Sequence, residues 1–395
     1  MSKRKIAIFT GNRAEYGLQY PIVKAVANHP DLEYYLLVSG AHLQEDFGYT
    51  LEEINKDGFE VYKEVEIKME KDNLFSTVQA IGSCVLSLSG ILDELRPDFH
   101  VVYADRFEGF AAVISSTQMG IPTAHIEGGD ITEGGALDDS VRHAMTKLAH
   151  LHFTTNEEAA ERIRKMGEES WRVHNVGFPA IDLIQEQNYA TADELVDKYG
   201  LDLNRPIILF TQHSVATEHD SALAQLAPSI EAMKILAGEG YQVILTFPNN
   251  DAGGKRIIGF LKDIDKQGLS NIQVHASLGR YNYHGILNVS VNGGNGVCVG
   301  NSSSGIKETP AFGCPCVNIG SRQQGRLRAD NVIDVDYAAA EIIKACRKSI
   351  KDEGFRRVCR ECVNPYGNGD AGVKIAKVLA ETEISQKLVQ KRMVY

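Results

Sequence analysis

The chain has 395 residues, more than the roughly 250–300 at which a single hydrophobic core stops growing, so we expect two domains. Hydrophobic residues make up 43% of the chain and charged residues 24%, as in an ordinary soluble globular protein. The net charge of −11, from 41 basic and 52 acidic residues, argues against nucleic acid as a partner.

The N-terminus carries no pattern of a signal peptide, because Met1–Lys5 leads directly into a short predicted strand. We find no run of about 18 apolar residues, and therefore expect no membrane partner. The seven cysteines are an odd number without the spacing of a disulfide framework. Together these observations predict a protein of the reducing cytoplasm.

In the first half, three predicted strands end in polar residues. The strand Lys5–Phe9 leads into Thr10-Gly11-Asn12-Arg13, and Phe99–Tyr103 leads into a polar turn with Asp105 and Arg106. The strand Thr123–Ile126 is followed directly by Glu127. Helix-compatible residues lie between the strands, which predicts a parallel α/β sheet with its ligands at the carboxyl ends of the strands.

The second half repeats this layout. The strand Pro206–Phe210 leads into a polar segment with His213, and a later strand leads into the loop Phe247–Gly254. The apolar run Val297–Val299 runs into Gly300-Asn301-Ser302-Ser303-Ser304-Gly305, and Cys316–Ile319 precedes two arginines. Each half is therefore predicted to be a doubly wound domain, with boundaries at residues 1–185 and 186–370 and a linker near Gly177–Asn204.

The acidic residues of the first half are candidates for proton transfer. Asp105 and Glu127 follow strands that we expect to be neighbours, and Asp138 and Asp139 begin a helix that points toward the same edge. Carboxylates gathered there would raise one another's pKa and suit general acid/base chemistry. Alternatively, they are helix caps and dipole partners. His143, one turn later, either joins the site or packs on its helix.

The serine-rich loop after Val297–Val299 predicts a nucleotide-phosphate site. Small residues let backbone N–H groups and hydroxyls approach an anion, and the following helix adds partial positive charge at its N-terminus. Glu308 lies about one turn into that helix and is suited to bind a sugar hydroxyl. The alternative is a helix N-cap without a ligand, although four such residues in a row exceed what one cap requires.

Several other polar residues follow strands and could contact an anionic ligand. Arg13 suits a phosphate or carboxylate, and no GxGxxG motif accompanies it, so a nicotinamide cofactor is disfavoured. His213 could hydrogen-bond a ligand or neutralise a leaving phosphate, or could be a surface loop residue. Asn249 and Asp251 lie in the loop Phe247–Gly254, and Arg322 could meet a diphosphate.

Eight ordered motifs resemble one family over nearly the whole chain: GNRAEYG, ADRFEG, HIEGGD, DDSVRHAMTKLAH, TQHS, FPNNDAGG, GNSSSGIKE and GSRQQGR. The chain is similar to hydrolysing UDP-N-acetylglucosamine 2-epimerases, which supply N-acetylmannosamine for sialic acid synthesis. A related group acts on UDP-N,N'-diacetylbacillosamine for legionaminic acid synthesis. The motifs do not separate these two substrates, and we expect the first because it is the commoner activity.

The resemblance implies a GT-B fold, with two Rossmann-like domains, a UDP-sugar in the cleft between them, and a C-terminal helix at 371–395 that crosses back to the first domain. It implies anti elimination of UDP to 2-acetamidoglucal, followed by addition of water, without metal or nicotinamide. A homo-oligomer, dimer or tetramer, is also implied. The implied catalytic residues are Asp105, Glu127, Asp138 and His213. The expected substrate-binding residues are Arg13, Arg106, Asp139, His143, Asn249, Asp251, Ser302, Ser303, Glu308 and Arg322.

Two features depart from the pattern of the resemblance or qualify it. The segment between Glu127 and Asp138 is about two residues longer than in the N-acetylglucosamine enzymes, and it should border the sugar. Leu18 stands near the position where non-hydrolysing relatives carry a lysine, which favours the hydrolysing class. Two other functions share UDP binding: a GT-B glycosyltransferase and a non-catalytic UDP-sugar sensor. Neither requires the cluster of acidic residues.

Overall fold

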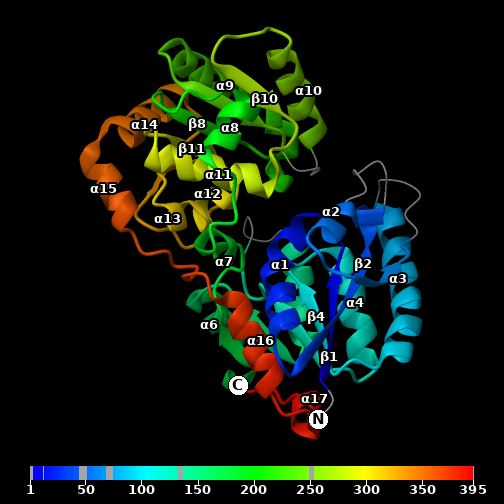
Figure 1. Ribbon diagram of the computed structural model, residues 1–395. Coiled ribbons are helices and arrows are strands. Elements are labelled where there is room, and N and C mark those ends of the chain that lie inside the picture. Colours follow the sequence, from blue (N-terminus) through cyan, green and yellow to red (C-terminus); the bar gives the residue numbers. More distant parts are fainter. Residues whose placement is uncertain are drawn as a thin grey trace. The chain divides into compact units, whose positions relative to one another are not determined.

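The chain forms two parallel β-sheets, one in each of two compact units (Figure 1). The computed structural model describes residues 3–11, 13–43, 51–67, 74–131, 137–248 and 253–394. Of these, the first unit contains the residues up to Ile131, Leu137–Asp182 and those from Tyr366 onward, and the second unit contains Leu183–Pro365. The sequence analysis placed the two domain boundaries after residues 185 and 370. In the structure, the chain passes from one unit to the other at two crossing points, after Asp182 and after Pro365.

The sheet of the first unit has the strand order β3-β2-β1-β4-β5-β6-β7, and all its strands are parallel. The chain adds β2 and β3 on one side of β1 and then β4 to β7 on the other side. The place between β1 and β4 is therefore the topological switch point, where doubly wound sheets bind ligands. The strands are β1 (Arg4–Thr10), β2 (Leu32–Ser39), β3 (Val61–Val65), β4 (Phe99–Tyr103), β5 (Thr123–Ile126), β6 (Leu151–Thr154) and β7 (Val173–Asn175).

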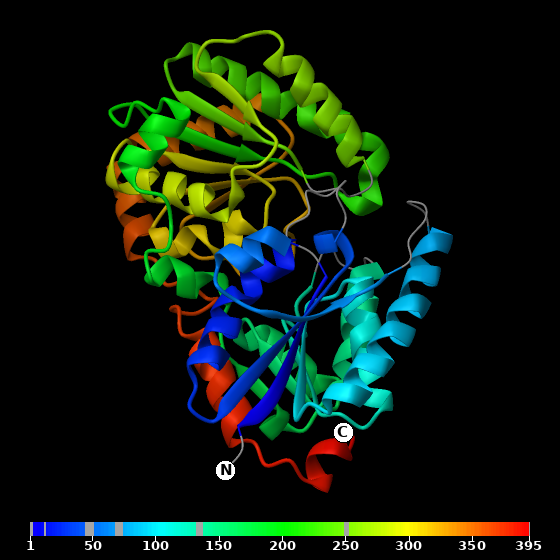
Figure 2. The ribbon, with the colours of Figure 1, turned by 45° about the vertical axis from the view of Figure 1, so that its right-hand side comes forward.

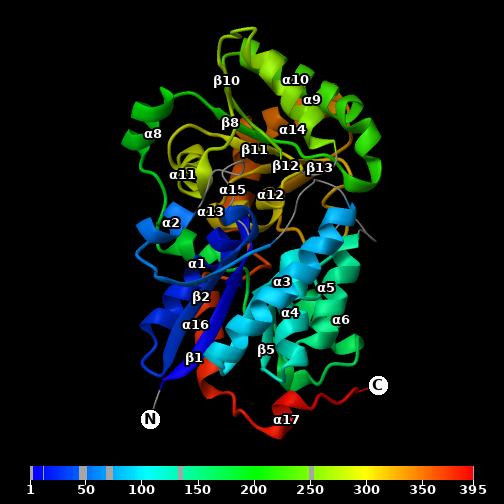
Figure 3. The same cartoon turned by 90° about the vertical axis from the view of Figure 1, so that its right-hand side faces the viewer.

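Helices cover both faces of this sheet because alternate strand residues point to opposite sides. Ile6 and Ile8 pack with α1 and α16 on one face, whereas Ala7 and Phe9 pack with α3, α4 and α5 on the other. Figure 3 shows α3, α4 and α5 together on that second face. The helices are α1 (Arg13–Asn28), α2 (Leu51–Lys56), α3 (Leu74–Leu95), α4 (Phe107–Gln118), α5 (Leu137–Leu148), α6 (Glu157–Lys165), α16 (Ala371–Glu381) and α17 (Gln386–Val389), and α7 (Ala180–Gln185) spans the crossing point.

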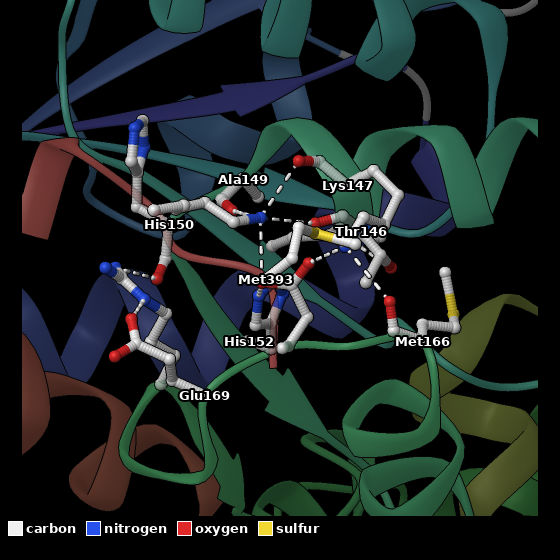
Figure 4. Close-up of polar contacts among 12 residues, drawn as sticks. Thr146, Lys147, Ala149, His150, His152, Met166, Glu169 and Met393 are labelled. Carbon is white, nitrogen blue, oxygen red and sulfur yellow. Dashed lines mark hydrogen bonds and ion pairs between the residues drawn. The ribbon is translucent and has the colours of Figure 1, made fainter. Parts of the chain in front are cut away.

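The C-terminal segment is an integral part of the first unit. Helix α16 lies along α1, as Figures 1 and 2 show, and its first turn donates two backbone hydrogen bonds to Asp182. Further on, the Lys391 ammonium donates to the carbonyl oxygens of Thr146, Lys147 and Ala149 at 3.2, 2.9 and 2.6 Å (Figure 4). These carbonyls lie at the C-terminal end of α5, where an α-helix leaves carbonyl groups without partners. The tail therefore caps α5.

The second unit repeats the topology of the first. Its strand order is β10-β9-β8-β11-β12-β13, which corresponds to β3-β2-β1-β4-β5-β6. The repeated layout expected from the sequence is thus present, with a second switch point between β8 and β11. The strands are β8 (Ile207–Thr211), β9 (Gln242–Thr246), β10 (Ile272–His275), β11 (Val297–Gly300), β12 (Cys316–Ile319) and β13 (Val332–Val335).

Helices again cover both faces of the second sheet. Ile208 and Phe210 share one core with α9, α10 and α14, and Ile207 and Leu209 share the other with α8 and α11. The helices are α8 (Ala192–Tyr199), α9 (Ala222–Gly238), α10 (Gly254–Asp265), α11 (Gly279–Asn292), α12 (Ser304–Lys307), α13 (Thr309–Phe312), α14 (Ala339–Lys351) and α15 (Glu353–Glu361).

One helix among the described residues is long and apolar enough to cross a bilayer by length and composition alone. It covers Phe75–Leu95 with a mean hydropathy of 1.5. Sequence analysis found no such run because serines, a threonine and glycines interrupt the apolar residues. A single helix of this kind is a weak indication, since core helices of soluble proteins have the same composition. Here 28% of the apolar window is buried, with Cys84, Leu88 and Leu92 in the core of the first unit.

We predict that buried histidines make the protein less stable in acid. His100 on β4 is fully buried, and neither ring nitrogen has a hydrogen-bond partner among the described residues. Burial lowers its pKa to about 3, so below pH 6.5 the unfolded chain takes up a proton that the folded protein does not. Stability is therefore complete above pH 6.5 and falls as the pH drops from there toward 3. Between pH 7 and pH 5 this histidine should remove about 2 kcal/mol.

Urea unfolding of the wild type and of His100→Leu at both pH values measures this contribution. The variant should lose about 2 kcal/mol less than the wild type on acidification. His29→Leu, at a partly exposed position in the same unit, is the matched control and should keep the pH dependence of the wild type. Equal losses in His100→Leu and the wild type would contradict the prediction.

Candidate functional site

In the first unit, Asp105 follows the carboxyl end of β4 and forms an ion pair with Arg142 on α5. The Arg142 side chain is only 4% exposed. Its Nη2 atom faces Asp105, and its Nη1 atom donates to Asp139 at 2.7 Å and to the backbone carbonyl of Asp130 at 2.9 Å. Arg142 thus holds the loops after β4 and β5 against the start of α5. The sequence predicts mutual repulsion among these acids or capping of helices, and the structure adds a buried guanidinium that compensates two of them.

Glu127 lies directly after β5, next to the strand that carries Asp105. Its backbone has a φ of 63°, and Ala104, which precedes Asp105, has a φ of 56°. Residues other than glycine rarely adopt this left-handed conformation, and strain of this kind gathers at functional sites. Glu127 is 9% exposed and lies beside Tyr103, whose pKa is raised by burial and by this carboxylate.

The first turn of α5 places its two aspartates differently. Asp138 is exposed, and its charge acts on Arg106, whereas Asp139 is buried against Arg142. His143, one turn further, is half-buried, and burial lowers its pKa. The structure therefore brings Asp105 and Asp139 together at Arg142, places Glu127 after the adjacent strand, and leaves Asp138 exposed.

The two arginines expected near this edge lie at the starts of helices. Arg106 immediately precedes α4, is 49% exposed, and pairs with Glu108 at 3.3 Å. Arg13 is the first residue of α1, at the carboxyl end of β1, but its side chain is outside the part of the chain that the structure describes. Both backbone positions are at the edge of the first sheet where the carboxyl ends of the strands lie.

In the second unit, Asn301 joins three loops at the carboxyl ends of the strands. Its amide accepts from the His213 backbone N–H at 2.7 Å and donates to the His213 carbonyl at 2.9 Å. Its own carbonyl accepts from Arg322 at 3.2 Å and Gln323 at 2.9 Å. Only glycine fits before it, because a Cβ on Gly300, with φ +127°, would lie 1.9 Å from the Thr211 carbonyl oxygen.

His213 is buried, and Arg322 lies near it. Burial, and then the charge of Arg322, lower the pKa of His213 to about 3. The imidazole is therefore neutral at pH 7. Of the two roles considered for it, hydrogen bonding to a ligand fits this protonation state, whereas charge neutralisation would first require an anion that raises its pKa.

The serine loop begins the short helix α12, as the sequence predicted. Ser302 and Ser303 are half-buried before this helix, and Glu308 lies between α12 and α13. Glu308 accepts a hydrogen bond from His284 Nε2 at 2.7 Å. Asn249 and Asp251, predicted to contact the ligand, lie outside the described residues. No cluster of three or more potential metal ligands occurs among the residues the structure describes.

Comparison with known proteins identifies the family. A family profile described as UDP-N-acetylglucosamine 2-epimerase matches residues 24–380. The chain belongs to this family. It is 32% identical to "UDP-N,N'-diacetylbacillosamine 2-epimerase (hydrolyzing)" of Legionella pneumophila, over 99% of this chain and 100% of that protein. It is 30% identical to "UDP-N-acetylglucosamine 2-epimerase" of Neisseria meningitidis, over 99% of both chains.

The fold is also that of solved epimerases. A crystal structure of UDP-GlcNAc 2-epimerase from Neisseria meningitidis bound to UDP-GlcNAc matches with a TM-score of 0.79 and 18% identity, over 96% of this chain and all of that one. These matches confirm the family resemblance of the eight motifs, the GT-B fold of two doubly wound domains, and the expectation that this epimerase-family chain is an enzyme.

Three residues of this epimerase-family site were not found from the sequence. Arg142, Asn301 and His284 connect the predicted residues, yet each occupies a position that indicates only helix or loop. Their partners are 37, 88 and 24 residues away in the chain. The DDSVRH segment held a signal for Arg142, since an arginine one turn after two aspartates suits an ion pair on one helix face.

We predict that Arg142→Met costs about 3–5 kcal/mol in the free energy of unfolding, because it leaves two largely buried carboxylates without their cation. Arg164→Met is the matched control. It removes an arginine of the first unit whose partners Glu157 and Glu161 are more than half exposed, and should cost no more than about 1 kcal/mol. Urea unfolding at pH 7 compares the two, and equal effects would show that Arg142 does not hold the acidic cluster.

Proposed function

We propose that the protein is a hydrolysing 2-epimerase, which converts a UDP-linked 2-acetamido sugar and water to UDP and the free sugar inverted at C2. The observation that carries this proposal is the placement of Asp105 and Glu127. They follow the adjacent strands β4 and β5, where the backbones of Ala104 and Glu127 are left-handed, and Asp105 pairs with the buried Arg142, in a chain of the epimerase family. A glycosyltransferase or a UDP-sugar sensor has no use for this arrangement.

The proposed reaction needs one group that removes a proton and one that delivers a proton. In the first step a base takes the C2 proton, the electron pair of the C2–H bond forms the C1–C2 double bond, and UDP leaves with the electron pair of the C1–O bond. In the second step water adds its hydroxyl to C1, and a proton reaches C2 on the opposite face. Asp105, Glu127 and Asp138 are the proposed acid/base groups, since carboxylates at fixed positions suit both transfers.

The second unit is proposed to bind the nucleotide. Ser302 and Ser303 precede α12 and would contact the diphosphate, Arg322 would balance its charge, and Glu308 would accept from the ribose. A neutral His213 would donate a hydrogen bond to the leaving phosphate. Arg13 is proposed as a further cationic contact.

UDP-N-acetylglucosamine is the first candidate substrate, because it is the commoner activity of the family. UDP-N,N'-diacetylbacillosamine is the second, favoured by the name of the Legionella pneumophila relative and by the longer segment between Glu127 and Asp138. That segment includes Gly134 and Gly135, which lie outside the described residues. Pockets distinguish a methyl-sized difference by only about 10–200-fold, so we propose measurable turnover of both sugars.

We predict that the protein alone, with either UDP-sugar and water, releases UDP and the free C2-inverted sugar. Phosphorus and proton NMR follow both products, and no acceptor or cofactor is added. The ratio of kcat/KM for the two sugars, before and after deletion of Gly134 and Gly135, then assigns the substrate. Absence of UDP release from both sugars would contradict the proposed function.

We predict that Asp105→Asn and Glu127→Gln each reduce turnover by about 10²-fold or more, since acid/base groups contribute about 10²–10⁴. UDP affinity, measured by calorimetry, should change little, because the proposed nucleotide residues all belong to the other unit, apart from Arg13. The matched control is Glu157→Gln, an exposed carboxylate of the first unit in the surface ion pair with Arg164. Near-normal turnover in both amide variants would refute the acid/base assignment.

A further inference from the structure

Glu308 is held by a histidine that none of the motifs includes. His284 lies on α11 and is 1% exposed. Its Nε2 atom lies 2.7 Å from Oε2 of Glu308, so the two side chains form a hydrogen bond between α11 and the junction of α12 and α13. A buried polar side chain is costly unless it is paired, and here the partner is the carboxylate proposed to bind the ribose.

The histidine ring is fixed from several sides. Phe312 contacts it edge to face, with 5.6 Å between ring centroids, and Tyr283 lies beside it at 6.5 Å. Its Nδ1 atom has no hydrogen-bond partner among the described residues. Because a carboxylate only accepts, Nε2 must carry the hydrogen, which leaves the carboxylate as the one strong partner of this ring.

The carboxylate in turn has its orientation set by the histidine. Burial alone would raise the pKa of Glu308, but the hydrogen bond and charge of His284, with Ser304, bring it below its ordinary value. The Glu308 side chain keeps 13% of its surface exposed. With Oε2 engaged by His284, the other oxygen can accept from a ligand hydroxyl.

We propose that His284 is a positioning residue, which fixes Glu308 so that its second oxygen accepts hydrogen bonds from the ribose hydroxyls of the nucleoside diphosphate. The inference rests on the proposed function, since it assigns the ribose contact to Glu308. A glutamate that is already oriented loses less side-chain entropy when the ligand binds, so the binding free energy is more favourable. This effect is present only for ligands that carry the ribose hydroxyls.

The test compares UDP with 2',3'-dideoxy-UDP, which lacks the hydroxyls, by calorimetry. His284→Phe keeps an aromatic ring but removes the donor, and should weaken UDP binding about tenfold while 2',3'-dideoxy-UDP binding stays within twofold. His284→Gln restores an N–H donor and should recover most of the loss. In Glu308→Gln, adding His284→Phe should cause no further loss. With the UDP-sugar as substrate, His284→Phe should raise KM and keep kcat within twofold of the wild-type value.

His275→Phe is the matched control, because it makes the same change in the same unit at a histidine that hydrogen-bonds Gln273 and, in the described part of the chain, no carboxylate. Circular dichroism and thermal unfolding check the fold of each variant, and His284→Leu is a second donor-free variant of smaller volume.

Equal weakening of UDP and 2',3'-dideoxy-UDP would overturn the proposal, as would unchanged UDP affinity in the donor-free variants. If Glu308→Gln leaves UDP affinity unchanged while the wild type still releases UDP and free sugar, the ribose assignment fails and the proposed activity stands. If neither UDP-sugar is turned over but the hydroxyl-dependent loss is observed, the activity fails and the role of His284 stands.

Discussion

All strands within each sheet run parallel, and this constraint decides where polar side chains can gather in the molecule. Parallel strands are buried on both faces by helices, so their residues are apolar over most of the strand. Polar residues gather where a strand ends, and all carboxyl ends of a sheet meet at one edge. Asp105 and Glu127 follow two such ends in the first unit, and His213 and Asn301 follow two in the second.

The two edges differ in their electrostatics. In the first unit, the carboxylates of Asp105 and Asp139 pair with the buried guanidinium of Arg142. Their negative charge is compensated locally, and the carboxylates stay ionised. In the second unit, His213 is neutral. The side-chain amide and the backbone carbonyl of Asn301 join the loop of His213 to the loop of Arg322. One edge therefore carries carboxylates, a group suited to proton transfer, and the other carries hydrogen-bond donors, a group suited to an anion.

Sequence reasoning found the strands that precede the candidate site residues and the polar residues at their ends, because an apolar run and the polar segment after it are local signals. It placed the strand Phe99–Tyr103 at the observed bounds, and Val297–Val299 one residue short of the observed end. It could not find His284, or the pairing of Arg142 with Asp105, since these depend on partners that only the fold brings near. It also overestimated repulsion among the acids, because the compensating cation lies inside a helix where an arginine predicts only a charged face.

The first unit is discontinuous, because it contains both the start of the chain and the residues from Tyr366 onward. Asp182 receives hydrogen bonds from residues 189 and 190 positions later, and Lys391 completes the end of α5. During synthesis, the whole second unit emerges from the ribosome before these contacts can form, so it can fold while the first unit is still incomplete. The half of the molecule that carries the acidic cluster is thus the last part to reach its final structure, and a chain that terminates early exposes the surface of α1 that α16 would cover.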